Sequence, residues 1–107
     1  MVINTLFYGI PFIINMKQEI IDGFSYIKAS KTRKKILIAL DENILIPSEI
    51  SKITNVSPAH ISRALKQLQE NNLILCLNPE KRVGKLFVTT ELGKSVLKCV
   101  KKYMINR

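Results

Sequence analysis

The spacing of apolar residues along the chain predicts five helices and one hairpin. Apolar side chains recur every three or four residues in five segments, which is the period of a helix with one buried face. These segments are residues 15–27, 31–40, 47–54, 58–71 and 91–107. Between the last two, LILCLN and KLFVTT have strand-like patterns around a turn with Pro79 and Gly84. We therefore expect an α+β, mostly α-helical, protein with a two-stranded hairpin.

Polar residues at the starts of these segments support the helix assignments. Asn, Ser and Thr side chains accept a hydrogen bond from a free N–H of the first turn, and proline suits the first helical position. Pro47 and Pro58 occupy such positions, and Asn72 can adopt the left-handed conformation that ends many helices. The run ILI (44–46) predicts a short strand. The N-cap candidates are Asn15, Ser30, Ser57 and Thr90.

The order of the predicted elements is that of a winged helix-turn-helix. Two helices joined by a tight turn are followed by a two-stranded hairpin, the wing, with additional helices at the N- and C-terminal ends. We expect a single domain over residues 16–107. Residues 1–15, MVINTLFYGIPFIIN, form an apolar arm that is too short to span a membrane. Either this arm packs on the domain or on a partner, or Met16 is the natural start.

An excess of positive charge narrows the class of partner. Seventeen Lys and Arg against eight Asp and Glu give a formal net charge of +9 at pH 7. This charge favours a polyanion, either nucleic acid or an anionic membrane surface. The N-terminal apolar run lacks the basic start of a signal peptide. Cys76 and Cys99 show no sign of forming a disulfide, so a reducing cytoplasm is the simplest setting, and we expect a cytoplasmic protein. The predicted helix 31–40 is basic on its outer side, at Lys31, Arg33, Lys34 and Lys35.

Residues that catalysis or metal binding would need are scarce. The sequence has no glycine-rich phosphate loop, and its single histidine has no nucleophile beside it. Cys76 and Cys99 are far apart and lie among apolar residues, where free cysteine acts as a small hydrophobic side chain. We therefore predict a protein that is not an enzyme and that uses no cofactor and no metal.

The segment 57–71 has the features of a DNA recognition helix. Ile61, Leu65 and Leu68 form its buried anchor, and the opposite face has no acidic residue before Glu70. One α-helix fits the major groove of B-DNA, and small residues at its start let the backbone come close. The candidate contacts on this helix are Ser57, Pro58, Ala59, His60, Ser62, Arg63 and Lys66.

Different contacts are expected from different residues. Arg63 is the best candidate for reading a base, because its guanidinium can bond O6 and N7 of guanine together. Lys66 and Ser48 are candidates for phosphate contacts. Each such residue alone is often an ordinary solvated side chain, but their combination favours double-stranded DNA. The wing, over the minor groove or backbone, contributes Lys81, Arg82 and Lys85.

These residues also resemble winged-helix transcriptional regulators of bacteria and archaea, of the MarR and ArsR type. The likeness covers about residues 30–97 and is strongest in VSPAHISRALKQLQENNLI, with its Ser-Pro start, Ser-Arg pair and Leu-x-x-Leu. It continues in LFVTTELGK. Asn72 stands where such proteins usually have glycine, and Ile46 where they have a Ser or Thr cap. The cysteine motifs of metal-sensing ArsR proteins are absent, so the resemblance does not extend to metal sensing.

The resemblance implies a homodimer that binds palindromic or pseudo-palindromic DNA sites. The predicted function is a sequence-specific, double-stranded DNA-binding transcriptional regulator with no membrane partner, and no small-molecule effector is assigned. The alternative is a winged-helix protein–protein interaction module in a transcription or replication assembly. Apolar residues near both ends of the domain fit a dimer, although they would also fit packing within their own domain. These interface candidates are Ile20, Ile21, Phe24, Val100, Tyr103 and Met104.

Overall fold

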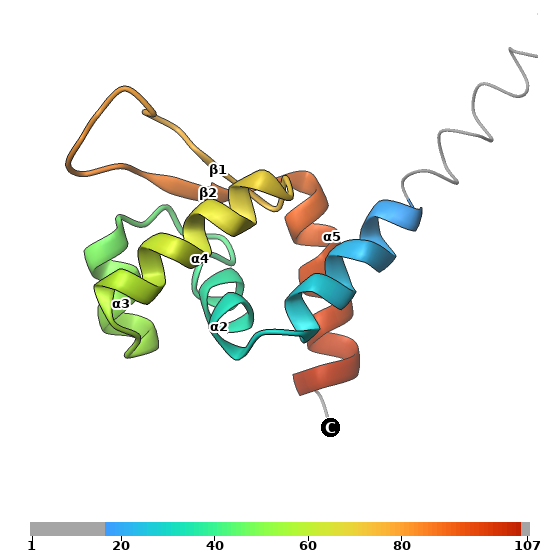
Figure 1. The fold of residues 1–107 in the computed structure, drawn as a ribbon. Coiled ribbons are helices and arrows are strands. Elements are labelled where there is room, and N and C mark those ends of the chain that lie inside the picture. Colours follow the sequence, from blue (N-terminus) through green and yellow to red (C-terminus); the bar gives the residue numbers. More distant parts are fainter. Residues whose placement is uncertain (1–16, 106–107) are drawn as a thin grey trace, which may run out of the picture.

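The computed structural model describes residues 17–105, whose elements follow the predicted order (Figure 1). Residues 17–28 are helical. The arm over residues 1–15 and the predicted cap Asn15 lie outside the described residues. The α+β, mostly helical, fold class is confirmed. The further elements are α2 (Lys31–Ala39), α3 (Pro47–Thr54), α4 (Pro58–Glu70), β1 (Ile74–Cys76), β2 (Phe87–Thr89), α5 (Glu91–Val100) and the π-helical turn η1 (Lys101–Ile105).

Side-chain caps set the starts of three helices, at the residues predicted from the sequence. Each cap oxygen accepts a hydrogen bond from the backbone N–H three residues further on, which satisfies one free donor of the first turn. The start of α3 differs, because Ile46 has no side-chain acceptor; instead its N–H donates to Oε1 of Glu49 at 2.9 Å. The three caps are Ser30 with Arg33 N (3.2 Å), Ser57 with His60 N (3.4 Å) and Thr90 with Gly93 N (3.0 Å).

Two asparagines in the left-handed conformation direct the chain into and out of α4. Asn55, after α3, has φ 59°, and Asn72, after α4, also has φ 59°. Asparagine tolerates this conformation better than most residues with a side chain. The predicted left-handed helix end at Asn72 is therefore confirmed, and the tight turn between α3 and α4 is that of a helix-turn-helix.

The core lies between α2, α4, the sheet and α5. Its centre is made of fully buried aliphatic side chains, and Ile61, Leu65 and Leu68 of α4 are buried there as predicted. Val100, predicted as a dimer contact, is completely buried in this core, so it has no surface to offer a partner. The other fully buried side chains are Ile27, Ile36, Leu37, Leu40, Ile50, Leu73, Ile74, Val96 and Leu97.

The sheet consists of β1 and β2, with one further residue pair beside β2. The strands are antiparallel, with Leu75 opposite Val88 and Cys76 opposite Phe87. Leu45, in the short run predicted as a strand, forms an isolated bridge with Phe87 on the other side. Both strands are shorter than predicted, because Oδ1 of Asn78 accepts the N–H of Leu86 at 2.8 Å where a strand neighbour would otherwise do so.

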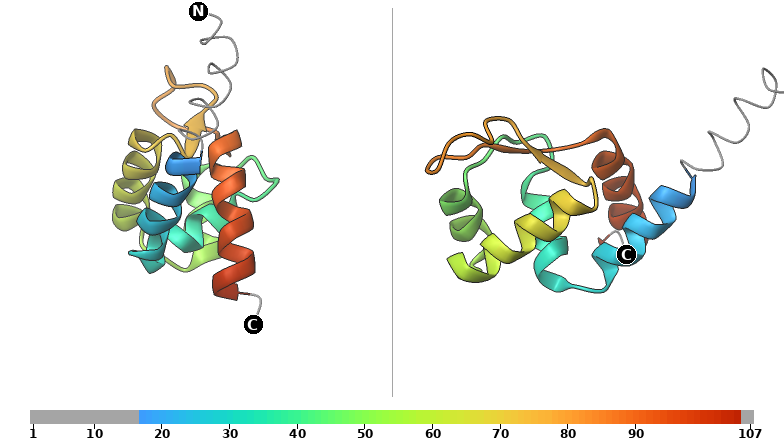
Figure 2. Two further views of the ribbon diagram at one scale, coloured as in Figure 1. Left: turned by 90° about the vertical axis from the view of Figure 1, so that its right-hand side faces the viewer. Right: turned by 45° about the horizontal axis from the view of Figure 1, so that its top comes forward.

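The elements separate into two ends of the molecule. The wing and α3 extend toward one side, where α4 begins, whereas the helix over 17–28 and α5 lie at the opposite side (Figures 1 and 2).

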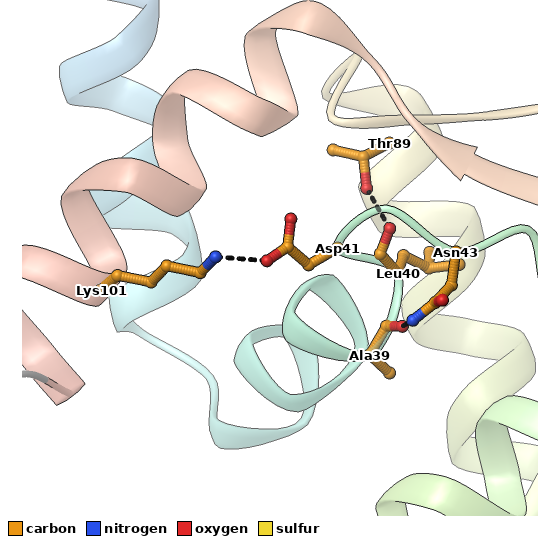
Figure 3. A network of polar contacts seen from close by, with 6 residues as sticks. All are labelled: Ala39, Leu40, Asp41, Asn43, Thr89 and Lys101. Carbon is orange, nitrogen blue, oxygen red and sulfur yellow. Dashed lines mark hydrogen bonds and ion pairs between the residues drawn. The ribbon is translucent and has the colours of Figure 1, made fainter.

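A polar network holds the end of α2 against β2 and η1 (Figure 3). Lys101 pairs with Asp41, and Oγ1 of Thr89 donates to the carbonyl oxygen of Leu40 at 3.0 Å. Among the described helices, none has the length and apolar character needed to cross a membrane.

Candidate nucleic-acid interface

The helix α4 and its cap Ser57 expose all the residues that the sequence predicted for DNA contact by the recognition helix. Successive residues of a helix are about 100° apart, so Ala59, Arg63 and Lys66 point in similar directions, away from the buried anchor. The first turn of α4 contains no acidic residue. The exposed predicted residues are Ser57, Pro58, Ala59, His60, Ser62, Arg63 and Lys66.

One edge of this exposed face meets the wing in a groove. Ser62, Lys66 and Gln69 line it from α4, and the buried Phe87 of β2 also lines it. The groove has a volume of about 310 Å³. Three cationic side chains surround it, and no carboxylate lines it. These cations are Lys66 from α4 and Arg82 and Lys85 from the wing.

The other edge of α4 faces the start of α2. His60, Arg63 and Gln67 line a second depression of about 240 Å³, together with Ser30, Thr32 and Arg33. The structure therefore divides the predicted contacts into two groups. Ser62 and Lys66 lie toward the wing, whereas His60 and Arg63 lie toward α2.

Arg33 differs from its prediction as part of a solvated basic face. Its side chain is half-buried, and its guanidinium contacts two other helices. Nε and Nη2 donate to the carbonyl oxygen of Tyr26, and Nη1 donates to Oε1 of Gln67 at 3.3 Å. Sequence reasoning missed both partners, because a helical pattern shows which face a residue occupies but not which distant residue it meets.

The wing tip is shaped by Asn78 and Gly84. Nδ2 of Asn78 donates to the carbonyl oxygen of Gly84 at 3.2 Å, and Gly84 has φ 77°, which favours glycine. Lys81 and Arg82 at the tip are exposed, and Lys85 is half-buried. Asn78 was not predicted; its position directly before Pro79 was the available signal, since Asn-Pro often begins a turn.

The predicted contact cations are not neutralised by carboxylates. Within residues 17–105, ion pairs form only between Lys94 and Glu91 and between Lys101 and Asp41. Arg63 and Lys66 therefore do not pair with Glu70, which was the ordinary alternative for these side chains. Ser48, the remaining predicted phosphate contact, is exposed in the first turn of α3.

The two cysteines occupy positions that are typical of small hydrophobic side chains. Cys76 is buried in the core, and Cys99 is half-buried on α5. The part of the chain that the structure describes contains no group of three His, Cys, Asp or Glu residues that could hold a metal ion.

Comparison with known proteins finds a family match for the central segment of the chain. Residues 30–75 match the family model described as bacterial regulatory protein, arsR family. No curated protein matches the chain significantly. The matched residues run from the cap of α2 into β1, so they include α2, the helix-turn-helix and the start of the wing.

Solved structures share the fold. A double mutant of ZitR from Lactococcus lactis is 33% identical, covering 69% of this chain and 51% of the ZitR chain, with a TM-score of 0.61. Reduced HlyU from Vibrio cholerae is 19% identical, with 83% and 97% of the two chains covered and a TM-score of 0.60. A MarR family transcription regulator is 18% identical, with 92% and 70% covered and a TM-score of 0.64.

The aligned region spans about half of the ZitR chain in the first of these matches, and the two matches below 20% identity show the fold alone. The arsR-family match, the ZitR likeness and the observed helix-turn-helix with its wing agree. The chain has the winged helix-turn-helix fold, and its residues 30–75 are similar to the arsR family of bacterial regulatory proteins.

Proposed function

We propose that this chain binds double-stranded DNA sequence-specifically as a homodimeric transcriptional regulator. In this proposal α4 enters the major groove, and the wing lies over the adjacent minor groove or backbone. Arg63 reads a base edge, and Lys66, Ser48 and the wing cations contact phosphates. The ArsR-type segment and the net charge of +9 support this function.

The observation that carries the proposal is the groove between α4 and the wing. Lys66, Arg82 and Lys85 come from separate elements, yet they line one depression without a carboxylate. Concentrating like charges in one place is unfavourable in the free protein, and a polyanion such as the DNA backbone relieves that repulsion. Because the groove adjoins the acid-free face of α4, one duplex can meet both surfaces.

The dimer part of the proposal rests on the opposite end of the molecule. Ile21 is 56% exposed and Tyr103 61% exposed, although both are large apolar or aromatic side chains. The rings of Phe24 and Tyr103 pack edge-to-face with centroids 6.2 Å apart. Ile20 and Met104 lie partly buried beside the core. Two copies that join through this end would leave both α4 helices free, as a palindromic site requires.

The test is a selection of bound sequences from random duplex, followed by titration of the selected duplex at several salt concentrations. We expect enrichment of a palindrome or pseudo-palindrome, and affinity that falls linearly on a log–log plot against salt. Equal, weak binding to every duplex would contradict sequence-specific regulation. No binding at low salt would leave the interaction module as the function of this fold.

A further inference from the structure

The outer side of the small sheet is aliphatic, and its inner side is buried in the core. Leu75 lies opposite Val88 on the neighbouring strand, and Leu77 donates its N–H to the carbonyl oxygen of Leu86 at 2.8 Å. On the far side of β2, Ile44 lines the same depression as Val88. Side chains alternate between the two faces of a strand, so these residues share the face opposite to buried Cys76 and Phe87. We call Ile44, Leu75, Leu77, Leu86 and Val88 the outer sheet face.

This face departs from the usual pattern of a small antiparallel sheet. Such sheets are normally apolar toward the core and polar toward water. Here Ile44 is 58% exposed, Leu77 50% and Leu75 44%. The groove proposed for DNA is lined by Phe87, from the inner side, so the outer sheet face is a separate surface. An exposed contiguous aliphatic patch is characteristic of an interaction site.

The size of the face favours a short segment as its occupant. A stable interface between two globular proteins buries roughly 800 Å² on each partner. Five partly exposed aliphatic side chains offer only a fraction of that area. One strand or one helical turn from a short apolar segment would cover them.

The chain contains such a segment in residues 1–15. Ten of these fifteen residues are apolar and none is charged, in a protein with a net charge of +9. Water is a poor environment for a segment of this composition, so burying its apolar surface is favourable. An uncharged segment would also add no charge to be desolvated on an aliphatic sheet.

The chain enters the described structure beside the start of β1. A Cβ added at Gly23 would lie 3.3 Å from Cδ2 of Leu73, the residue before β1, so the helix over 17–28 runs close to the start of this strand. One turn earlier, Glu19 lines the same depression as Asn72. Fifteen residues can reach up to about 50 Å, which is ample for a sheet that begins next to this point.

We propose that residues 1–15 cover the outer sheet face. The segment would pack its aliphatic and aromatic side chains on Ile44, Leu75 and Leu77 and exclude water from them. This proposal does not depend on DNA binding, because the outer sheet face is apart from the groove and from the exposed face of α4.

Hydroxyl-radical footprinting of the full chain tests the proposal. Ile53 on α3 is the matched control, since it is 59% exposed and lies outside the outer sheet face. After correction for intrinsic reactivity, we expect Leu75 and Leu77 to be labelled several-fold less than Ile53. Labelling in proportion to their fractional exposures would overturn the proposal. Protection that disappears on dilution would also overturn it, because it would identify a second copy as the occupant.

A pair of substitutions tests the same contact from the other side. Leu77→Ser weakens the outer sheet face, and Ile53→Ser makes the same change on α3. We expect chymotrypsin to cleave after Phe7, Tyr8 or Phe12 several-fold faster in Leu77→Ser than in the wild type, with Ile53→Ser unchanged. Equal cleavage rates in all three proteins would show that residues 1–15 do not pack on this face. Circular dichroism confirms that each variant is folded.

Discussion

Arg33 stacks on Tyr26, with its Cζ atom 3.8 Å from the ring centroid, and also donates two hydrogen bonds to the carbonyl oxygen of that residue at 3.0 and 2.8 Å. This carbonyl lies in the last turn of the helix over 17–28, where helix carbonyls lack partners within the helix. Through Nη1 and Gln67, the same guanidinium reaches α4. Arg33 therefore joins the end proposed for dimerisation to the helix proposed for DNA reading.

Replacing Arg33 by Lys should destabilise the fold by about 1–3 kcal/mol, because Lys keeps the charge but loses the planar fork and the stacking. Urea unfolding measures this change. Arg63→Lys is the matched control: it is the same substitution on the exposed face of α4, and we expect it to change stability by less than about 0.5 kcal/mol. Equal effects of the two substitutions would mean that the Arg33 contacts contribute nothing to the fold.

Arg63 and Lys81 should differ in how they affect DNA binding. Arg63→Ala should cost about 1–3 kcal/mol on the selected duplex and relax the preference at one base pair, because base contacts carry sequence information. Lys81→Ala should weaken all duplexes alike and lower the salt slope by about 0.9 for each lost phosphate contact. Fluorescence anisotropy on matched and mismatched duplexes measures both. If Arg63→Ala weakened every duplex equally, Arg63 would be a phosphate contact.

The helix starts and the buried face of α4 were predictable because they depend on local signals. A serine before Pro58 and aliphatic residues at helical spacing determine where α4 begins and which side it buries, whatever the rest of the chain does. The contacts of Arg33 were not predictable in this way. Its partner Gln67 is 34 residues away, and a helical pattern does not report the angle at which two helices meet.

Val100 shows that the apolar pattern of a helix does not report which of its residues face a partner molecule. The helical spacing of apolar residues over 91–107 correctly marked an apolar face, but one such face can pack inward at one residue and face outward at another. Val100 is fully buried, whereas Tyr103, three residues later in η1, is 61% exposed. The aliphatic outer sheet face was also hidden in the sequence, because a strand that is apolar at every position can be read as buried on both sides.

Tyr103→Asp should weaken the proposed dimer. A carboxylate at this exposed position would be desolvated in an apolar interface, and the edge-to-face contact with Phe24 would be lost. We expect the dimer dissociation constant, measured by analytical ultracentrifugation, to rise at least tenfold. Ile53→Asp places the same charge on α3 and should leave association unchanged. If only Ile53→Asp dissociated the dimer, the interface would lie on the α2 and α3 side.

The ion pair between Lys101 and Asp41 predicts a dependence of stability on alkaline pH. The hydrogen bond that Nζ of Lys101 donates to Oδ2 of Asp41, and then the negative charge of Asp41, raise the pKa of Lys101 above the ordinary 10.5. The folded state thus holds the Lys101 proton more tightly than the unfolded state. The resulting stabilisation is fully present below pH 10.5 and is lost as the pH rises through the raised pKa.

Urea unfolding of wild type and Asp41→Asn between pH 8 and pH 11.5 measures this contribution. The difference in free energy of unfolding between wild type and Asp41→Asn should be constant up to about pH 10 and then shrink at higher pH. Glu80→Gln, which removes an exposed carboxylate from the wing, should show no such change. If the free energy of unfolding of the wild type exceeded that of Asp41→Asn by a constant amount up to pH 11.5, Asp41 would stabilise the fold without its ion pair to Lys101.

Gly93→Ala should be among the most damaging single substitutions in the domain. An added Cβ would lie 2.1 Å from the carbonyl oxygen of Leu73 and 2.5 Å from Cγ2 of Thr89. The Leu73 carbonyl is held by the N–H of Thr90 at 3.1 Å, so relieving the clash requires backbone movement. Overpacking of this kind costs about 1–3 kcal/mol or more, which outweighs the gain of up to about 1 kcal/mol from helix propensity.

Gly84→Ala is the informative comparison for this clash. Its Cβ would meet no atom within 4 Å, and its cost would come from φ 77° alone, about 1 kcal/mol. Thermal unfolding of both variants compares the stability lost to a steric clash in the core with the stability lost to backbone strain at the wing tip. We expect the melting temperature to fall much further in Gly93→Ala. Suppose instead that the two variants lost similar stability. The start of α5 would then have to move away from Leu73 at little cost in free energy. The packing of α5 on the residue before β1 would be looser than the distances indicate.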